Sequence, residues 1–435
     1  MEPVDRIVLL GVDELRGYPG NARKHDKKQV SQIAESIRRF GFVNPILIDG
    51  CGQVVCGHGR LAAAKLLGLH KVPTISVAHL SKDELRAYAI ADNKIALNAT
   101  WDNELLGVEL QHLLSIDFDL AITGFSTTEV DLVFAAGNEL SDDEPPIPPL
   151  PSRAVSQAGD LWFLGDHRLI CGDAQDIQTF ITLMGGELAE MCFTDPPYDL
   201  PINGHVSGLG KHQHREFAFA SGEMGSAEFT TFLSVTLAHS GLYLRDGAIA
   251  YVCMDWRHIG ELLQAGELVL GEYKQLCIWN KSNAGMGTFY RSKHELIFVF
   301  KVGTAPHINN FGLGDTGRYR TNVWDYPGMS SPTKTRDAEL AMHPTVKPVK
   351  LVEDAMLDCS HRGGVVLDCF GGSGTTLIAA ERTARKARLV EIDPRYCDTI
   401  IARFEQATGK LATLGHSGPA FKAVAQARAA ELEAV

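Results

Sequence analysis

The tetrapeptide Asp195-Pro196-Pro197-Tyr198 follows the apolar run MCFT and carries the most specific chemistry in the sequence. The amine of an aromatic base is a poor nucleophile, because its lone pair is delocalised into the ring. The Asp195 carboxylate and the Pro196 carbonyl offer two acceptors that can draw this lone pair out of conjugation. The prolines fix φ and hold these acceptors ready, and Tyr198 offers a ring for an extruded base. The alternative is a plain Asp-Pro-Pro turn that ends a strand.

A glycine-rich turn in VVLDCFGGSGTTLIAAERTA is the second candidate site. Gly371, Gly372 and Gly374 let the backbone approach a ligand closely, and a helix that begins near Thr375 points unpaired N–H groups at the turn. Such a turn is typical of a nucleotide-binding crevice in an open α/β sheet, where a carboxylate such as Glu391 on the next strand holds ribose hydroxyls. The turn lacks the lysine of a P-loop and the spacing of G-x-G-x-x-G. A simple strand-to-helix turn is the alternative.

The elements around these motifs alternate between strand and helix from about residue 160 onward. Short apolar or β-branched runs predict strands, and they are MCFTD, GAIAYVC, CIWNK, ELIFVF, VVLDCF and RLVEID. This alternation predicts an α/β fold, a Rossmann-like doubly wound sheet with helices on both faces. The carboxyl ends of its strands are where both motifs begin.

Four further segments complete the predicted organisation. Residues 1–80 predict a small α/β domain, and residues 81–136 a helical spacer with a capping box at Ser81 and Glu84. The acidic, Pro-rich stretch 137–159 predicts an extended, solvated linker. Residues 160–410 form the main domain and residues 411–435 a tail.

Composition restricts the class of protein. The 435 residues are 45% hydrophobic and 22% charged, which is typical of a globular chain. No apolar run is long enough to span a bilayer and no signal peptide is evident, so we expect a cytoplasmic protein without membrane association. The net charge of −12 is concentrated in the spacer and linker, while residues 1–80 and 274–320 are locally basic. The nine cysteines lack zinc-site spacing, so we expect no metal.

The two motifs belong to an ordered series. LGDHRLICGDA, FTDPPYDL, YRSKHELIFVF, HPTVKP, LDCFGGSGTT and LVEIDPRYC follow one another along residues 160–410. In this order they resemble the permuted-class (beta) DNA amino-methyltransferases, which modify N6 of adenine or N4 of cytosine. The resemblance implies S-adenosyl-L-methionine as cofactor and a base flipped out of double-stranded DNA as substrate. It also implies a role in restriction-modification, with a cognate restriction endonuclease as a candidate partner.

The resemblance also implies roles for single residues. Asp195, Pro196, Pro197 and Tyr198 would be catalytic. The glycine loop would hold the methionine end of the cofactor, Glu391 its ribose and Asp173 its adenine. The full set of implied cofactor-binding residues is Asp173, His343, Lys347, Asp368, Phe370, Gly371, Gly372, Gly374, Thr375 and Glu391.

The target amine is the open question at this level. Asp at the first position of the tetrapeptide goes with adenine more often than with cytosine in this class, so adenine N6 is the prediction and cytosine N4 the alternative. Methylation at carbon 5 of cytosine would need a cysteine nucleophile from a Pro-Cys motif, and no proline directly precedes any of the cysteines. The motifs are also compatible with a DNA-binding adaptor that has an inactive methyltransferase fold, and with a methyltransferase that acts on RNA or protein.

Target recognition in this class lies largely between the two motifs, here about 200–345. Basic and aromatic residues interleave in this region, and both can contact DNA. The basic candidates are Lys281, Arg291, Lys293, Arg318 and Arg320, and the aromatic ones are Trp279, Phe289, Tyr290 and Tyr319.

The N-terminal segment from NARKHD to VPTISV resembles the ParB/sulfiredoxin-like fold. Its glycine-arginine motif, Gly57, His58, Gly59 and Arg60, opens a predicted helix whose N–H groups can hold a phosphate. ParB proteins usually have Gly-Glu-Arg-Arg here and sulfiredoxins place Cys directly before His-Arg. Because this chain departs from both, the resemblance favours a DNA-positioning or structural domain over a catalytic one.

Overall fold

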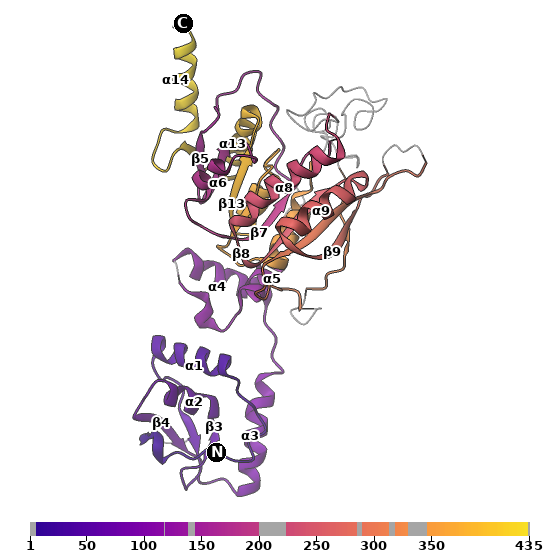
Figure 1. Ribbon diagram of the computed structural model, residues 1–435. Coiled ribbons are helices and arrows are strands. Elements are labelled where there is room, and N and C mark those ends of the chain that lie inside the picture. The colour runs from indigo at the N-terminus through magenta and orange to yellow at the C-terminus, as the bar shows by residue number, and fades with distance from the viewer. Residues whose placement is uncertain are drawn as a thin grey trace. The chain divides into compact units, whose positions relative to one another are not determined.

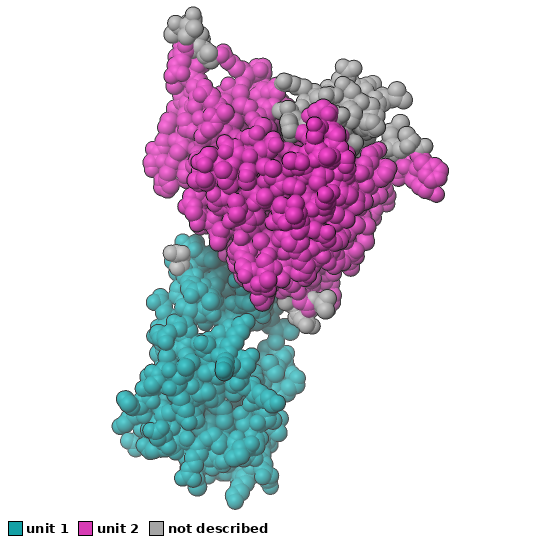
Figure 2. All heavy atoms as spheres, in the orientation of Figure 1, with its two compact units in different colours: residues 1–139 teal, residues 140–435 magenta. Residues whose placement is uncertain are grey.

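The computed structural model describes residues 6–116, 118–137, 144–199, 223–284, 289–312, 318–328 and 346–433. The chain divides into two compact units, residues 1–139 and 140–435 (Figure 2). Within the described residues, no helix combines the length and apolar character that crossing a membrane would require.

The first unit is built on a four-stranded sheet with the order β1-β4-β2-β3. Figure 1 labels β3 and β4 of this sheet near helices α1, α2 and α3. Helix α1 begins after Asp26, whose side chain accepts the Gln29 N–H, and ends at Gly41 with φ 82°. The elements are β1 (Ile7–Gly11), η1 (Val12–Glu14), α1 (Lys27–Phe40), β2 (Ile46–Ile48), β3 (Val54–Cys56), α2 (His58–Leu66) and β4 (Lys71–Ser76).

Helices continue the first unit after the sheet. They are α3 (Lys82–Ala96), α4 (Asn103–Ser115), η2 (Leu120–Thr123) and α5 (Thr127–Gly137). The predicted capping box is present, since the Ser81 side chain accepts the Glu84 N–H and Glu84 bonds back to the Ser81 N–H. Helices α4 and α5 share a small core of Leu110, Val130 and Val133.

The second unit is one mixed sheet of ten described strands, in the order β11-β9-β10-β8-β7-β12-β13-β6-β5-β14. Strands β8, β7, β12, β13 and β6 run parallel. The elements are β5 (Leu161–Leu164), β6 (His167–Cys171), α6 (Ile177–Met184), β7 (Ala189–Thr194), α8 (Ser226–Leu242), β8 (Leu244–Met254), η3 (Trp256–His258), α9 (Ile259–Val269), β9 (Gly271–Asn280), β10 (His294–Val302), β11 (Val323–Asp325), α11 (Val349–Cys359), β12 (Val365–Asp368), α12 (Thr375–Arg382), β13 (Lys386–Glu391), α13 (Pro394–Thr408), β14 (Ala412–Leu414) and α14 (Phe421–Glu433).

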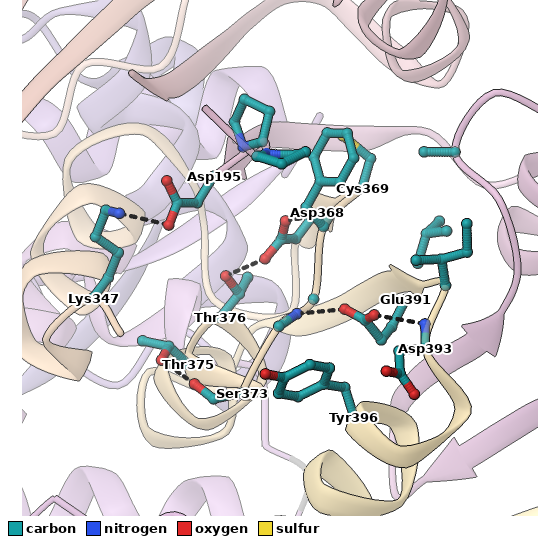
Figure 3. Close-up of a pocket in the computed structure, with 18 of the residues that line it drawn as sticks. Asp195, Lys347, Asp368, Cys369, Ser373, Thr375, Thr376, Glu391, Asp393 and Tyr396 are labelled. Carbon is teal, nitrogen blue, oxygen red and sulfur yellow. Dashed lines mark hydrogen bonds and ion pairs between the residues drawn. The ribbon is translucent and has the colours of Figure 1, made fainter. Parts of the chain in front are cut away.

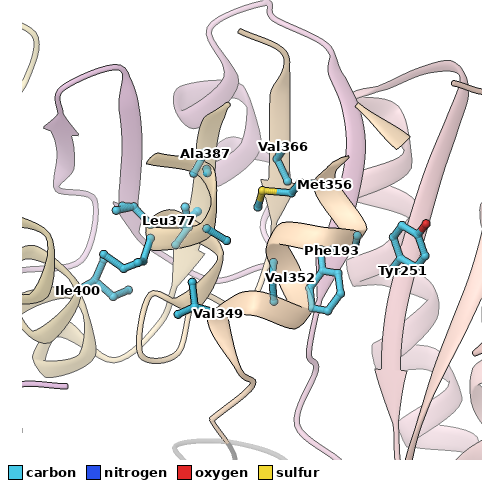
Figure 4. Close-up of a cluster of buried hydrophobic side chains, with 14 of the residues drawn as sticks. Phe193, Tyr251, Val349, Val352, Met356, Val366, Leu377, Ala387 and Ile400 are labelled. Atoms are coloured by element: carbon cyan, nitrogen blue, oxygen red, sulfur yellow. The ribbon is translucent and has the colours of Figure 1, made fainter. Parts of the chain in front are cut away.

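Both faces of this sheet carry a core, because the side chains of its strands alternate between them. Phe193 and Val366 face helices α11, α12 and α13, where they join Val352 and Leu377 (Figure 4). Cys192 and Leu367 face the opposite way, toward helices α6, α8 and α9. The predicted doubly wound α/β sheet is therefore confirmed, and every strand predicted from an apolar run is present.

The segment after residue 143 packs against the rest of the second unit instead of lying in solvent. Ile147 is buried, and the backbone N–H groups of Val155 and Ser156 donate to the Asp398 carboxylate at 2.6 and 2.9 Å. Prolines favour such packing, because a buried residue without a backbone N–H leaves no unpaired hydrogen-bond donor. The acidic composition predicted a solvated chain and did not reveal these contacts.

Candidate active site

The two motifs meet because their strands are neighbours. Strand β12 pairs with β7 in parallel, with Val366 opposite Met191 and Leu367 opposite Cys192. Parallel neighbours end at the same edge of the sheet, so Asp195, one residue beyond β7, and the glycine turn after β12 open on one side. Strands β12 and β13 come late in the chain yet lie between β7 and β6. The geometry thus agrees with a permuted order of motifs.

A cavity of about 390 Å³ lies at this edge of the sheet, within the size range of ordinary ligand sites. Most of the predicted site residues line it. They are Asp173, Asp195, Pro196, Pro197, Tyr198, Lys347, Asp368, Phe370, Gly371, Gly372, Thr375 and Glu391. Gly374 precedes Thr375 as the N-cap of α12, and His343 lies outside the described residues. Figure 3 shows Asp195 and Lys347 on one side of the cavity and Glu391 and Tyr396 on the other.

The glycine turn needs glycine at two positions. Gly372 and Gly374 have φ of 53° and 81°, in the left-handed region that side chains with a β-carbon disfavour. A β-carbon on Gly374 would also approach Ile400 of α13 to 3.2 Å. The turn leads directly into α12 at Thr375, so the unpaired N–H groups at the start of this helix face the cavity. The predicted strand, turn and helix are confirmed.

Two buried carboxyl groups flank the turn. Glu391 accepts backbone N–H bonds from Gly372 and Asp393, both at 2.8 Å. Asp368 accepts from Thr376 Oγ1 at 2.6 Å and from the Phe370 N–H at 3.0 Å. Burial raises the pKa of each carboxyl to about 7, and the hydrogen bonds only partly offset it. Each group can therefore change protonation near neutral pH.

Asp195 is held from both of its oxygens. Tyr198 Oη donates to Oδ1 at 2.6 Å, and Lys347 Nζ donates to Oδ2 at 2.5 Å. Lys347 also donates to Tyr198 Oη at 3.1 Å and lies 3.0 Å from Glu295 Oε2. Burial raises the pKa of Asp195, Lys347 opposes the rise and Glu295 adds to it. The resemblance assigned Lys347 to the cofactor, whereas its ammonium group contacts the Asp195 carboxylate.

Several residues at the site received no role from the sequence. Glu295 on β10 contacts Lys347 but does not itself line the cavity. It lies in the run KHELIFVF, and the sequence feature that could have indicated it is an acidic residue at the start of an apolar strand. Leu150, Ser373, Asp393 and Tyr396 line the cavity. Leu150 comes from the segment predicted to be a solvated linker, and no local pattern distinguishes it.

The basic DNA-binding candidates separate into two groups. Arg318 and Arg320 are mostly buried and both pair with Asp358, at 2.8 Å each. Their role in DNA binding stays a prediction. Lys281 pairs with Glu295. Arg291 and Lys293 are exposed, next to the exposed aromatics of Phe289 and Tyr290.

The remaining aromatic candidates also divide. Trp279 is buried and its Nε1 donates to the Tyr326 carbonyl at 3.0 Å. Tyr319 is 84% exposed. Only the exposed side chains are available to an outside partner.

The glycine-arginine motif of the first unit is confirmed as a helix start. Gly57 has φ 103° and caps α2, whose first residue, His58, accepts the Tyr18 N–H on Nε2 at 3.1 Å. Burial lowers the pKa of His58, which favours the neutral ring that this bond needs. Arg60 donates to the Asn44 carbonyl at 3.1 Å.

Comparison with known proteins agrees with this architecture. Residues 189–403 match the family model for DNA methylases, residues 104–158 the ParB-methyltransferase HTH domain, and residues 2–94 the ParB N-terminal domain. The matched HTH region covers much of the stretch that composition predicted to be spacer and linker. The domain boundaries predicted from the sequence stay predictions.

Individual relatives match parts of the chain. The ParB-like nuclease domain-containing protein YnaK of Escherichia coli (strain K12) is 43% identical over 79 residues, 18% of this chain and 91% of YnaK. The type II methyltransferase M.HpaI of Haemophilus parainfluenzae is 25% identical over 256 residues, 55% of this chain and 74% of M.HpaI.

A solved structure of the M1.HpyAVI–SAM complex covers 54% of this chain and 97% of that one, with 19% identity and a TM-score of 0.40. The family models place a methylase domain after two ParB-type domains in the sequence. Residues 189–403 belong to the N6/N4 DNA methylase family, and a ParB N-terminal domain and a ParB-methyltransferase HTH domain precede them in the sequence.

Proposed function

We propose that this protein transfers a methyl group from S-adenosylmethionine to N6 of an adenine flipped out of double-stranded DNA, at a specific sequence. The observation that carries the proposal is that Asp195 and the glycine turn line one cavity. A base amine at Asp195 and a methyl donor at the turn would then be within reach of each other. The family covers both adenine and cytosine amines, and Asp195 in the first motif position favours adenine.

The residues of the cavity fit the methyl donor. Glu391 lines the cavity and can accept ribose hydroxyls, while the N–H groups at the start of α12 suit the carboxylate of a methionine moiety. When bound, S-adenosylmethionine supplies a methyl group on a sulfonium centre, and its transfer leaves neutral S-adenosylhomocysteine. Phe370 and Val346 add apolar walls, which exclude water from the transfer.

The chain activates the amine by accepting its hydrogen bonds. The Asp195 carboxylate accepts one N–H of the base and the Pro196 carbonyl accepts the other, so the nitrogen lone pair points at the methyl group. Tyr198 holds Oδ1 of Asp195 in the ligand-free protein, and the base amine would replace this bond. The Tyr198 hydroxyl keeps its bond from Lys347, and the ring offers a face on which the base can stack. No covalent enzyme intermediate is needed, because the amine is the nucleophile.

The test is incubation of the full chain with methyl-labelled S-adenosylmethionine and separate samples of unmethylated plasmid DNA, RNA and protein. Label in DNA alone, recovered as N6-methyladenine after digestion to nucleosides and mass spectrometry, is the expected result. N4-methylcytosine would replace the adenine assignment with the cytosine one. Cofactor binding without transfer to any substrate would favour a DNA-binding adaptor. Single-molecule sequencing of the methylated plasmid would give the recognition site. A cognate endonuclease stays a prediction.

A further inference from the structure

Four charged side chains form a row beside the cavity, and the two in the middle of the row are mostly buried. In order they are Asp195, Lys347, Glu295 and Lys281, and each pairs with the next. They come from four separate segments, namely the turn after β7, the residues before α11, strand β10 and the end of β9. Lys347 has only 4% of its side chain exposed and Glu295 has 15%. Charges this deep persist only when they are paired.

The ammonium group of Lys347 directs its three donors to two members of this row and to one neighbouring hydroxyl. They go to Asp195 Oδ2, to Glu295 Oε2 and to Tyr198 Oη. Because Glu295 and Tyr198 hold the ammonium from two further directions, Lys347 is fixed on one oxygen of Asp195. Among the described residues, the other oxygen, Oδ1, is bonded only by the Tyr198 hydroxyl, a neutral donor that a base amine can replace.

We propose that Glu295 is a positioning residue for methyl transfer, which anchors Lys347 on Oδ2 of Asp195 and thereby leaves Oδ1 for the amine of the target base. The inference rests on the proposed function of Asp195 and extends it to two residues. Lys347 keeps the buried carboxylate ionised. Glu295 keeps Lys347 from closing over both oxygens and offsets the positive charge of Lys347 near the amine, which itself becomes positive during transfer.

The charges facing Asp195 support these roles and set the direction of each effect. Lys347 opposes the rise that burial causes in the pKa of Asp195, while Glu295 adds to that rise. Glu295 itself is held at a pKa of about 2 by Lys347 and Lys281, despite its burial. Asp368 and Cys253 face the same carboxylate from β12 and β8. Neither is a member of the row, and both are unchanged in the variants described below.

The experiment compares Glu295→Gln, Lys347→Met and the double variant in the full chain, with single-turnover methylation of plasmid DNA measured from pH 5 to pH 9. Lys347→Met should move the acid limb of the rate profile up by about one pH unit or more, since Asp195 loses its cation. Glu295→Gln should lower the transfer rate by about tenfold to 100-fold without moving the acid limb upward. Cofactor affinity, measured separately by calorimetry, should stay unchanged in Glu295→Gln.

The double variant tests whether Glu295 acts through Lys347. If it does, Glu295→Gln should cost little further rate once Lys347 is already Met. Glu272→Gln is the matched control, because Glu272 pairs with Lys274 and Lys301 at the far end of β9, and it should leave rate and pH profile unchanged. Fully additive losses, or a Glu295→Gln enzyme with wild-type rate, would overturn the inference. If the wild-type chain methylates nothing, the proposed function itself fails instead.

Discussion

The hydroxyl of Thr194 donates a hydrogen bond to Asp368 Oδ1 across 3.0 Å, although the two residues are 174 positions apart. Thr194 is the last residue of β7 and Asp368 the last of β12. The bond therefore ties the strand that leads to Asp195 to the strand that leads to the glycine turn. Both side chains are buried, so water cannot replace the bond if it is lost.

Thr194→Val should weaken this tie without changing side-chain shape. We expect the free energy of unfolding to fall by about 1–3 kcal/mol, because a buried carboxyl loses a donor. Chemical denaturation of the purified chain measures it. Thr399→Val is the control, since its buried hydroxyl donates to the Arg395 carbonyl of its own helix and ties no second element. Equal losses in both variants would contradict a special role for the Thr194 bond.

Asp195→Ala should abolish transfer while leaving cofactor binding intact. In the proposed mechanism the carboxylate contacts the base amine and not the cofactor. Lys347 keeps Glu295 as its ion-pair partner, so no lone charge is buried. We expect a rate loss of about 100-fold or more, measured with labelled S-adenosylmethionine and DNA. A loss of cofactor affinity as large as that expected for Gly374→Val would contradict the role assigned to Asp195.

Gly374→Val should lower cofactor affinity. The residue has φ 81°, and its β-carbon would meet Ile400 at 3.2 Å, so the turn must shift at a cost of about 1–2 kcal/mol or more. Calorimetry with S-adenosylhomocysteine measures the affinity. Gly363→Val is a matched control, because Gly363 has φ 79° but open space around it and lies outside the cavity. If both variants bind the cofactor alike, the turn does not hold it.

Cofactor affinity should rise with pH through neutrality. The pKa of Glu391 is about 7 in the ligand-free protein because the group is buried, and the ionised form accepts hydroxyl bonds better. The bound cofactor therefore favours the ionised form, so affinity should fall as the pH drops below about 7 and level off above about pH 8. Titrations at pH 6, 7 and 8 check this. Glu391→Gln should bind more weakly and lose the dependence, and a dependence that survives would point to Asp368 instead.

Phe289→Ala and Tyr290→Ala should weaken DNA binding. The two rings are 87% and 83% exposed and contact each other edge to face. An aromatic that stacks on a base contributes about 1–3 kcal/mol, which fluorescence anisotropy with labelled duplex DNA can measure. Leu268→Ala, at a similarly exposed apolar position on α9, should have no effect. Unchanged affinity in both aromatic variants would remove these two residues from the DNA interface.

The sequence by itself determined the local elements and the chemistry of the motifs. The glycine turn, the capping box at Ser81 and the apolar strands each depend on residues close together in the chain, so their patterns carry the information directly. The ordered motifs likewise indicated the family and fold class. Asp195 and Glu391 were singled out this way, and both line the cavity.

Only the tertiary structure decided which distant charges meet. Lys347 lies 152 residues from Asp195, and its pairing with the carboxylate depends on the order of strands in the sheet. The same order buries Arg318 against Asp358 and brings Leu150 to the cavity wall. Periodicity shows that a strand is buried but not which strand lies beside it, so such contacts cannot be deduced from local pattern.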